Sequence, residues 1–343
     1  MTSYERVMNR IEGKPVDKIP NLNIVMTFAS QYINVPYSKY VTDYKYLVEG
    51  SIKTAEAFGI DAVAAISDSW REAAGFGAKI IIPEDDVPFC REHLVTDLSQ
   101  IKKLKPVDPL SSERMLDRVR AIELFKHEVK NSYPIIGWVE GALAEATDLR
   151  DLSLVMMDLI IEPEAMIEFF ELIYIQQKAF AKVQIEAGAD IIGIGNAAAS
   201  LIGPKFYEKF CLEYDRRIIR DIQSMGAKAK LHICGNTEPI LGLIAKTEAD
   251  IFDVDHMVDF SKAVEIFKGT KTVANGNLDP VSVFLEQGPK QVKEATKKCI
   301  EIGDERTLIS GGCEIPRATP HENMLAMNEA LYVMKLDLAT GMC

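Results

Sequence analysis

Asp190-Ile-Ile-Gly-Ile194 is a short apolar run that stops at Gly195-Asn196, and residues 229–233 (Ala-Lys-Leu-His-Ile) form a second run of this kind. Between them, residues 204–224 place apolar side chains at the spacing of an amphipathic helix. Two short apolar runs joined by one amphipathic helix are typical of two parallel strands with the helix packed outside. This stretch therefore predicts an α/β protein.

The same unit repeats along the chain, with further helical patterns at residues 43–58, 165–186 and 288–302. Eight units predict a closed (β/α)₈ TIM barrel. A doubly wound open sheet is the alternative, but no Gly-x-Gly-x-x-Gly motif follows the first run. The eight apolar runs are residues 19–26, 62–66, 134–139, 190–194, 229–233, 250–254, 272–274 and 307–309.

Two features stand outside the repeat. Thr2-Ser-Tyr-Glu5 has the pattern of a capping box and predicts a short N-terminal helix. The connection from the second run to the third is much longer than one helix requires, and residues 79–83 and 88–94 suit an extra hairpin. We therefore predict an insertion at about residues 67–133, over the barrel mouth. No linker is evident, so residues 1–343 are predicted to form a single domain.

Charge and hydropathy limit the classes of partner. The 343 residues include 39 Lys and Arg against 51 Asp and Glu, which gives a net charge of −12. Nucleic acid and anionic lipid both require a basic face, so neither is expected as a partner. No apolar stretch approaches the roughly 20 residues that span a bilayer, and the N-terminus lacks a signal-peptide pattern. We expect a cytoplasmic protein without a membrane partner.

The C-terminal ends of barrel strands form the usual site of such a fold. Six cysteines are scattered along the chain, and no disulfide framework is expected. Two of them fall at predicted strand ends, and we interpret the other four as structural. Those four are Cys90, Cys211, Cys299 and Cys343.

His232-Ile-Cys234 is the most informative strand end, because residues i and i+2 of a strand point to the same face. Cys313 follows the last run, and Asp255 follows the sixth. Two thiolates, an imidazole and a carboxylate make a plausible tetrahedral zinc set. His256 and Asp253 are weaker alternatives to Asp255. Taken singly, a buried Cys is more often a small apolar residue, so the residues alone leave zinc and a structural role equally open.

Acidic and amide side chains at the other strand ends suggest further site residues. Glu140 ends the third run and Asn196 the fourth, and with Asp255 they are our candidate catalytic residues. Glu140, Glu145 and Asp68 suit substrate positioning and helix capping about equally.

Two aromatic side chains also lie beside strand ends. Trp138 and Trp70 suit packing better than an apolar wall for an aromatic or corrin face. Asn21 and Asn23 share one face of the first run and are interpreted as ordinary polar residues rather than pocket-facing ones.

The chain resembles the superfamily of uroporphyrinogen decarboxylase and its methyltransferase relatives over nearly its whole length. The decarboxylase branch uses an Arg-rich loop after the first strand, whereas residues 27–36 contain no Arg here. Cys313 also stands where those enzymes carry a His. The segments that carry the resemblance are residues 5–20, 186–190, 275–280, 311–316 and 319–320.

The corrinoid-dependent methyltransferase branch shares a zinc site built from His-x-Cys and a distant Cys, and His232, Cys234 and Cys313 match it. The fourth ligand would be an acid on a neighbouring strand, a position that Asp255 fits. The resemblance implies Zn²⁺ as cofactor and a corrinoid (cobalamin) carried on a separate partner protein, since no Asp-x-His-x-x-Gly signature occurs here.

This branch moves a methyl group between the cobalt of that corrinoid protein and either a methyl donor, such as a methoxylated aromatic, or a thiol. Residues 138–150 look most like the O-demethylase members. The alternatives are a metal-free decarboxylase and a non-catalytic zinc-binding protein.

Overall fold

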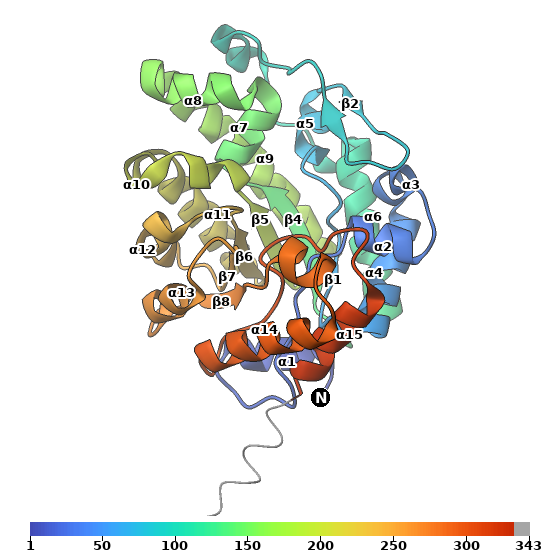
Figure 1. The fold of residues 1–343 in the computed structure, drawn as a ribbon. Coiled ribbons are helices and arrows are strands. Elements are labelled where there is room, and N and C mark those ends of the chain that lie inside the picture. The colour runs from blue at the N-terminus through green and yellow to red at the C-terminus, as the bar shows by residue number, and fades with distance from the viewer. Residues whose placement is uncertain (333–343) are drawn as a thin grey trace, which may run out of the picture.

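A computed structural model describes residues 1–332, so Cys343 lies outside the described residues. The centre of the fold is a parallel sheet of six strands in the order β1-β4-β5-β6-β7-β8 (Figure 1). This order follows the chain without reversal, so the doubly wound alternative is wrong. The strands are β1 (Val63–Ala64), β4 (Ile135–Glu140), β5 (Ile191–Gly195), β6 (Lys228–His232), β7 (Ile251–Val254) and β8 (Val273–Gly276).

The first and last predicted runs form single bridges instead of strands. Asn275 pairs with Leu308 and Ile309 pairs with Asn21, both in parallel. The Asp61 N–H donates to the Asn21 carbonyl at 2.7 Å, so these two runs lie between β8 and β1. The architecture is an α/β fold with a six-stranded parallel sheet, consistent with a TIM-like barrel.

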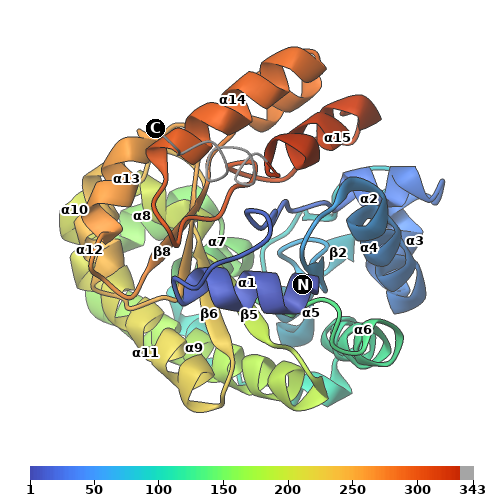
Figure 2. The ribbon, with the colours of Figure 1, turned by 90° about the horizontal axis from the view of Figure 1, so that it is seen from below.

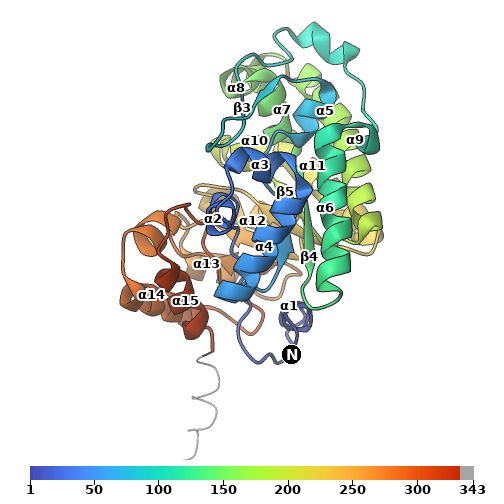
Figure 3. The same cartoon turned by 90° about the vertical axis from the view of Figure 1, so that its right-hand side faces the viewer.

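Helices surround the strands when the molecule is seen from below (Figure 2). Helices α4 and α6 lie side by side in Figure 3 and pack against each other. The α-helices are α1 (Ser3–Ile11), α2 (Thr27–Tyr32), α3 (Tyr37–Thr42), α4 (Tyr44–Phe58), α5 (Arg71–Phe76), α6 (Glu113–Val129), α7 (Ala142–Arg150), α8 (Leu152–Ile161), α9 (Pro163–Ala187), α10 (Gly203–Phe206), α11 (Leu212–Ser224), α12 (Leu241–Ala245), α13 (Phe260–Phe267), α14 (Pro289–Ile302) and α15 (His321–Ala330).

Shorter helical turns connect these elements. They are 3₁₀ turns η1 (Leu98–Lys103), η2 (Pro109–Ser111), η3 (Ala197–Leu201) and η5 (Glu238–Ile240), and π-helical turns η4 (Tyr207–Cys211) and η6 (Pro280–Leu285).

The chain between β1 and β4 contains the predicted hairpin. Strand β2 (Ile80–Ile81) pairs in antiparallel fashion with β3 (Phe89–Cys90). Helix α6 occupies the second half of the same segment and packs against β4, as the connecting helix of a barrel unit does. Residues 67–133 are therefore not confirmed as an insertion.

The predicted N-terminal helix and its capping box are confirmed. The Glu5 N–H donates to Thr2 Oγ1 at 3.1 Å, and the Thr2 N–H donates to Glu5 Oε2 at 2.8 Å. Helix α1 lies in front of the strands in the view from below (Figure 2). Its Val7 and Ile11 are buried in one cluster with apolar side chains of β4, β5, β7 and β8.

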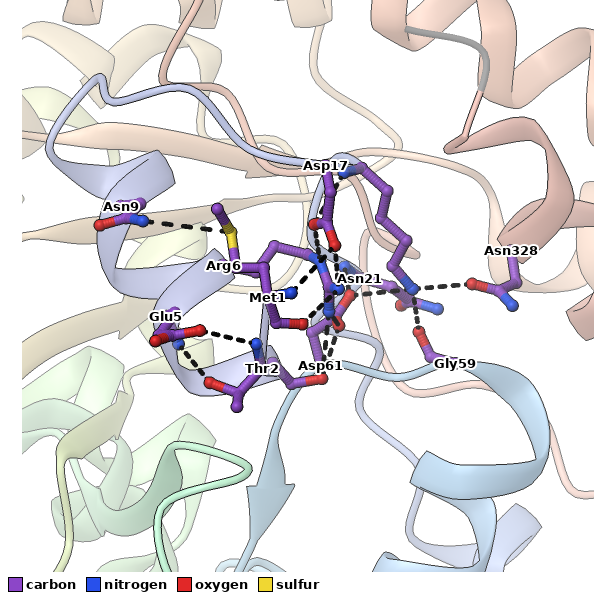
Figure 4. Close-up of polar contacts among 12 residues, drawn as sticks. Met1, Thr2, Glu5, Arg6, Asn9, Asp17, Asn21, Gly59, Asp61 and Asn328 are labelled. Carbon is purple, nitrogen blue, oxygen red and sulfur yellow. Dashed lines mark hydrogen bonds and ion pairs between the residues drawn. The ribbon is translucent and has the colours of Figure 1, made fainter. Parts of the chain in front are cut away.

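An ion-pair network fixes α1 to the chain just before β1 (Figure 4). Arg6 Nη1 donates to Asp61 Oδ1 at 2.6 Å, and Lys18 Nζ lies 3.2 Å from Asp61 Oδ2. The backbone N–H of Asn21 donates to the same carboxylate at 2.8 Å. Asp61 is buried and therefore depends on these partners for compensation of its charge.

Among residues 1–332, no helix is both long enough and apolar enough to cross a membrane. The cytoplasmic location stays a prediction.

Candidate metal centre

Much of the candidate site lies along one row of residues that are paired across neighbouring strands. Glu140 pairs with Gly195, Gly195 with His232, His232 with Asp253, and Asp253 with Asn275. Each residue comes from a different strand, at or near its C-terminal end. The row therefore brings together side chains that lie far apart in the sequence.

His232, Cys234 and Cys313 form one compact group. The His232 Nε2 atom lies 3.0 Å from the Cys234 sulfur and 4.0 Å from the Cys313 sulfur. The two sulfurs lie 3.6 Å apart. His232 is buried, whereas both cysteines are partly exposed. The predicted convergence of these three side chains is thus present, and within the described chain this is the one group of metal-binding type.

Asp253 orients the His232 ring from the side opposite the sulfurs. Its Oδ2 atom lies 2.9 Å from His232 Nδ1 and also pairs with Lys230 Nζ. Asn275 Nδ2 donates to Asp253 Oδ1 at 2.7 Å. A carboxylate on one ring nitrogen directs the other nitrogen toward a metal, which is the usual outer partner of a metal-binding histidine.

Hydrogen bonds within the group set its charge. The hydrogen bond from Cys234 lowers the pKa of Cys313 to about 4 and raises the pKa of Cys234. Burial lowers the pKa of His232, but hydrogen bonds to Asp253 and Cys313 outweigh burial and raise it to about 9. These hydrogen bonds favour the thiolate form of Cys313, the form in which sulfur binds metals.

Asp255, the predicted fourth ligand, lies outside this group. Its carboxylate accepts hydrogen bonds from the Gly235 and Met257 N–H groups, both at 2.9 Å. His256 Nδ1 lies 3.2 Å from the same carboxylate. These contacts hold the loops after β6 and β7 together.

A cavity of about 180 Å³ adjoins the three side chains. Its walls include Trp138 and Glu140 together with His232, Cys234 and Cys313. The Trp138 and His232 rings lie 5.9 Å apart, and Trp138 is packed in a buried apolar cluster while also lining the cavity. Trp70 does not line the cavity.

Gly195 keeps this part of the site open. A Cβ atom at this position would lie 2.7 Å from Glu140 Oε2 and 2.9 Å from Trp138 Nε1. Any side chain there would therefore displace two walls of the cavity.

Glu140 lies in the cavity wall with Arg71 behind it. Arg71 Nη2 donates to Glu140 Oε1 at 2.7 Å. Burial nevertheless raises the pKa of Glu140 well above its usual value. Asp68 also lines the cavity, and although burial raises its pKa, Arg114 lowers it to about 2. Glu145 does not line the cavity, and its carboxyl oxygens have no hydrogen-bond partner among the described residues.

Asn196 turns away from this cavity. Its Nδ2 atom donates to Asp215 Oδ1 at 3.0 Å, and its Oδ1 atom accepts from the Ala144 N–H at 3.2 Å. These contacts connect β5 to α7 and α11. The structure therefore does not bring Asn196 together with the other predicted catalytic residues.

Several site residues were missed from the sequence. Lys230 was not considered, although it lies two positions before His232 and shares its strand face. Asp253 was considered only as a ligand, not as the partner of the imidazole. Glu314 lines the cavity and accepts hydrogen bonds from the Thr27 N–H and Oγ1, both at 2.8 Å.

The strand-end group and the parallel sheet define the class: an α/β protein, barrel-like in architecture, with a candidate His-Cys-Cys metal centre. The chain belongs to the uroporphyrinogen decarboxylase family, because the family model described as Uroporphyrinogen decarboxylase (URO-D) matches residues 2–333. The family predicted from the sequence is thus confirmed.

Similar proteins include both branches of this family. The methylcobamide:CoM methyltransferase MtbA of Methanosarcina acetivorans is 30% identical over 339 residues, which cover 96% of this chain and 98% of the relative. A uroporphyrinogen decarboxylase of Trichodesmium erythraeum is 27% identical and covers 81% of this chain and 79% of its own.

A solved structure supports the fold. A methyltransferase from Methanosarcina mazei superposes with a TM-score of 0.89 at 23% identity, covering 98% of this chain and 99% of the other.

Proposed function

We propose that the protein is a zinc-dependent methyltransferase. It moves a methyl group between a small molecule and the cobalt of a corrinoid that a separate protein carries. The observation that carries this proposal is the group of His232, Cys234 and Cys313 beside a cavity at the strand ends. The similarity to MtbA supports the corrinoid chemistry.

The spacing of the three ligand atoms suits zinc. A tetrahedral zinc ion with bonds of about 2.3 Å to sulfur and about 2.0 Å to nitrogen separates its ligand atoms by roughly 3.5–3.8 Å. The corresponding separations here are 3.0, 3.6 and 4.0 Å. Small side-chain adjustments would bring all three atoms to these separations. The partial exposure of both cysteines suits a catalytic site better than a closed structural one.

Zinc in this site would hold a thiol substrate as its reactive thiolate, or polarise the oxygen of a methyl ether. The chain's own residues would do the rest. Asp253 keeps His232 in place, and the apolar face of Trp138 limits access of water to the substrate. We propose that Glu140, with its raised pKa, exchanges a proton with the substrate through its carboxyl group.

With a thiol as acceptor, its sulfur attacks the methyl carbon. A sulfur–carbon bond forms while the cobalt–carbon bond breaks, and its electron pair stays on the partner's cobalt. With a methyl ether as donor, the reduced cobalt(I) of the partner's corrinoid would supply the electron pair of the new cobalt–carbon bond. The pair of the broken carbon–oxygen bond would stay on the oxygen, which would take up a proton from Glu140. Asp255 stays our prediction for the fourth ligand. To bind the metal, its carboxylate would have to give up the hydrogen bond that it accepts from the Gly235 N–H.

We also propose that the chain forms one closed eight-unit barrel domain. The parallel bridges at Asn21 and Leu308 support closure between β8 and β1. The hairpin of β2 and β3 would then shape access to the mouth, because its Asp85 accepts a hydrogen bond from Arg317, four residues after Cys313.

The test is the rate of methyl transfer from methylcobalamin to a thiol. The change in absorbance of the corrinoid, as it loses its methyl group, measures this rate. We expect Cys313→Ala to lose the metal and to react at least about a hundredfold more slowly. A bound metal stabilises the charge of the transition state by several kcal/mol, and this stabilisation would be lost. Cys90→Ala, which changes a cysteine that neither lines the cavity nor belongs to the metal-binding group, should keep wild-type activity. Full activity in Cys313→Ala would refute the mechanism.

The metal-free decarboxylase is the second candidate, because named decarboxylases match this chain. Loss of a carboxylate from a porphyrinogen with chelator-treated protein would favour it.

A further inference from the structure

The cavity beside the candidate metal centre has two kinds of wall. Apolar side chains form part of it, among them Ile24, Met26 and Trp138. The polar part includes three acidic residues, Asp68, Glu140 and Glu314. With a volume of about 180 Å³, it accommodates only a small molecule.

No Lys or Arg side chain lines this cavity within residues 1–332. The guanidinium groups behind the wall already pair with its carboxylates. Arg114 donates to both Asp68 oxygens at 2.9 and 2.7 Å, and Arg71 donates to Glu140 at 2.7 Å. The His232 imidazole also lines the cavity, and its Nδ1 atom already pairs with Asp253 at 2.9 Å. An anion in the cavity would therefore face carboxyl groups without gaining a free cation.

Burial of the wall also affects the pKa of its acidic side chains. Burial raises the pKa of Glu140, which lines the cavity, so the surroundings disfavour a negative charge at this part of the wall. A permanently ionised group such as a sulfonate cannot escape this penalty by taking up a proton. A positively charged group would instead be favoured by the carboxylate of Asp68, because Arg114 outweighs the effect of burial and lowers the pKa of Asp68 to about 2.

We infer that the small molecule bound in this cavity is uncharged or positively charged, and that the cavity rejects anionic thiols such as coenzyme M. This inference rests on the proposed function and names the substrate class of the same site. It separates this chain from relatives that are named for coenzyme M. Specificity would then arise as much from the rejection of anions by the acidic wall as from favourable contacts with the bound molecule.

Three two-carbon thiols of similar size test the inference directly. They are 2-mercaptoethanesulfonate (coenzyme M), 2-mercaptoethanol and cysteamine, which are negative, neutral and positive at the end away from the sulfur. Their dissociation constants would be measured by calorimetry with zinc-loaded protein. We expect coenzyme M to bind at least about tenfold more weakly than 2-mercaptoethanol, and cysteamine at least as tightly as 2-mercaptoethanol.

The outcomes separate the inference from the proposed function. Tight binding of coenzyme M, equal to or better than the neutral thiol, would overturn the inference and leave the methyltransferase proposal intact. Failure of all three thiols to bind zinc-loaded protein would overturn both the inference and the thiol as acceptor.

A pair of matched variants tests the role of the wall. Asp68→Asn removes a carboxylate from the cavity and leaves Arg114 without its counter-charge. We expect this variant to bind coenzyme M at least about tenfold more tightly than wild type, with little change for 2-mercaptoethanol. Asp158→Asn is the control, because Asp158 forms a buried pair with Arg150 and neither residue lines this cavity.

If Asp68→Asn does not fold, Ser69→Lys adds a cation to the same wall without removing a buried charge. Zinc content is measured for each variant, so that loss of metal is not taken for loss of affinity. An unchanged ratio of the two dissociation constants in a folded, zinc-loaded variant would overturn the assignment of specificity to this wall.

Discussion

His232 has a carboxylate on one ring nitrogen and sulfur atoms near the other. Asp253 is itself held by Asn275 and by Lys230, all of them buried. Buried polar groups keep one geometry only when each has its partners. The position of the candidate ligand therefore depends on a chain of contacts that crosses three strands.

Asp253→Asn tests this dependence. The neutral amide accepts a weaker hydrogen bond from His232 and leaves Lys230 without its counter-charge. We expect the affinity for zinc to fall by about 10- to 100-fold, as for other partners of metal-bound histidines. Competition with a chromogenic chelator measures the change.

Asp250→Asn is the control, because Asp250 is a buried acid just before the same strand, far from the group, where it accepts from the Ala229 N–H. Wild-type zinc affinity in Asp253→Asn would show that the carboxylate does not position the imidazole.

The sequence predicts the ligands better than their partners. Alternation along a strand placed His232 and Cys234 on one face, and the end of the last run placed Cys313 opposite them. The pairing of His232 with Asp253 depends on the register between two strands, which no pattern within either strand specifies. The role of Asp253 could therefore not be derived from spacing alone.

At the scale of elements, six of the eight predicted runs form strands of the sheet. The first run makes only one bridge, because Pro20 has no N–H to donate and the Asn23 side chain, rather than its backbone, accepts from the Gly311 N–H at 2.7 Å. Side-chain hydrogen bonds of this kind replace ladder bonds locally. The spacing of apolar residues does not show where a side chain replaces the backbone as a hydrogen-bond partner.

The helical pattern at residues 204–224 is interrupted by the π turn η4. Just after it, α11 buries Asp215, which accepts hydrogen bonds from Tyr207 at 2.8 Å and Asn196 at 3.0 Å. Burial raises the pKa of Asp215 from 3.8 to about 7. The folded protein thus holds this proton more tightly than the unfolded chain.

Asp215→Asn should therefore change how stability depends on pH. Between about pH 4 and 7 the unfolded chain has lost the proton that the folded protein keeps, so Asp215 reduces wild-type stability as pH rises. The stability of the variant relative to wild type should increase through this window by up to about 1.4 kcal/mol per pH unit and level off above pH 7. Urea unfolding at several pH values gives this difference, and a difference that does not vary with pH would contradict the assignment.

At the scale of the whole molecule, α1 closes the end of the sheet opposite the candidate site. Arg6 and Lys18 are buried against Asp61, with the Asp61 side chain 2% exposed. Removing one member of a buried charged cluster leaves the others uncompensated, which typically costs about 3–5 kcal/mol.

Asp61→Asn should lower the free energy of unfolding in urea by an amount in this range. Its zinc content should stay at the wild-type level, because the network lies at the other end of the strands from His232. Loss of zinc together with stability would show that the two ends of the molecule are not independent.

The zinc content of the purified protein tests the central claim most directly. We predict about one zinc per chain in wild type and in Cys90→Ala, and almost none in Cys234→Ala or Cys313→Ala. Protein purified without chelators that contains no zinc, and takes up none when zinc is added, would contradict the account. Retention of zinc in Cys234→Ala would contradict it equally.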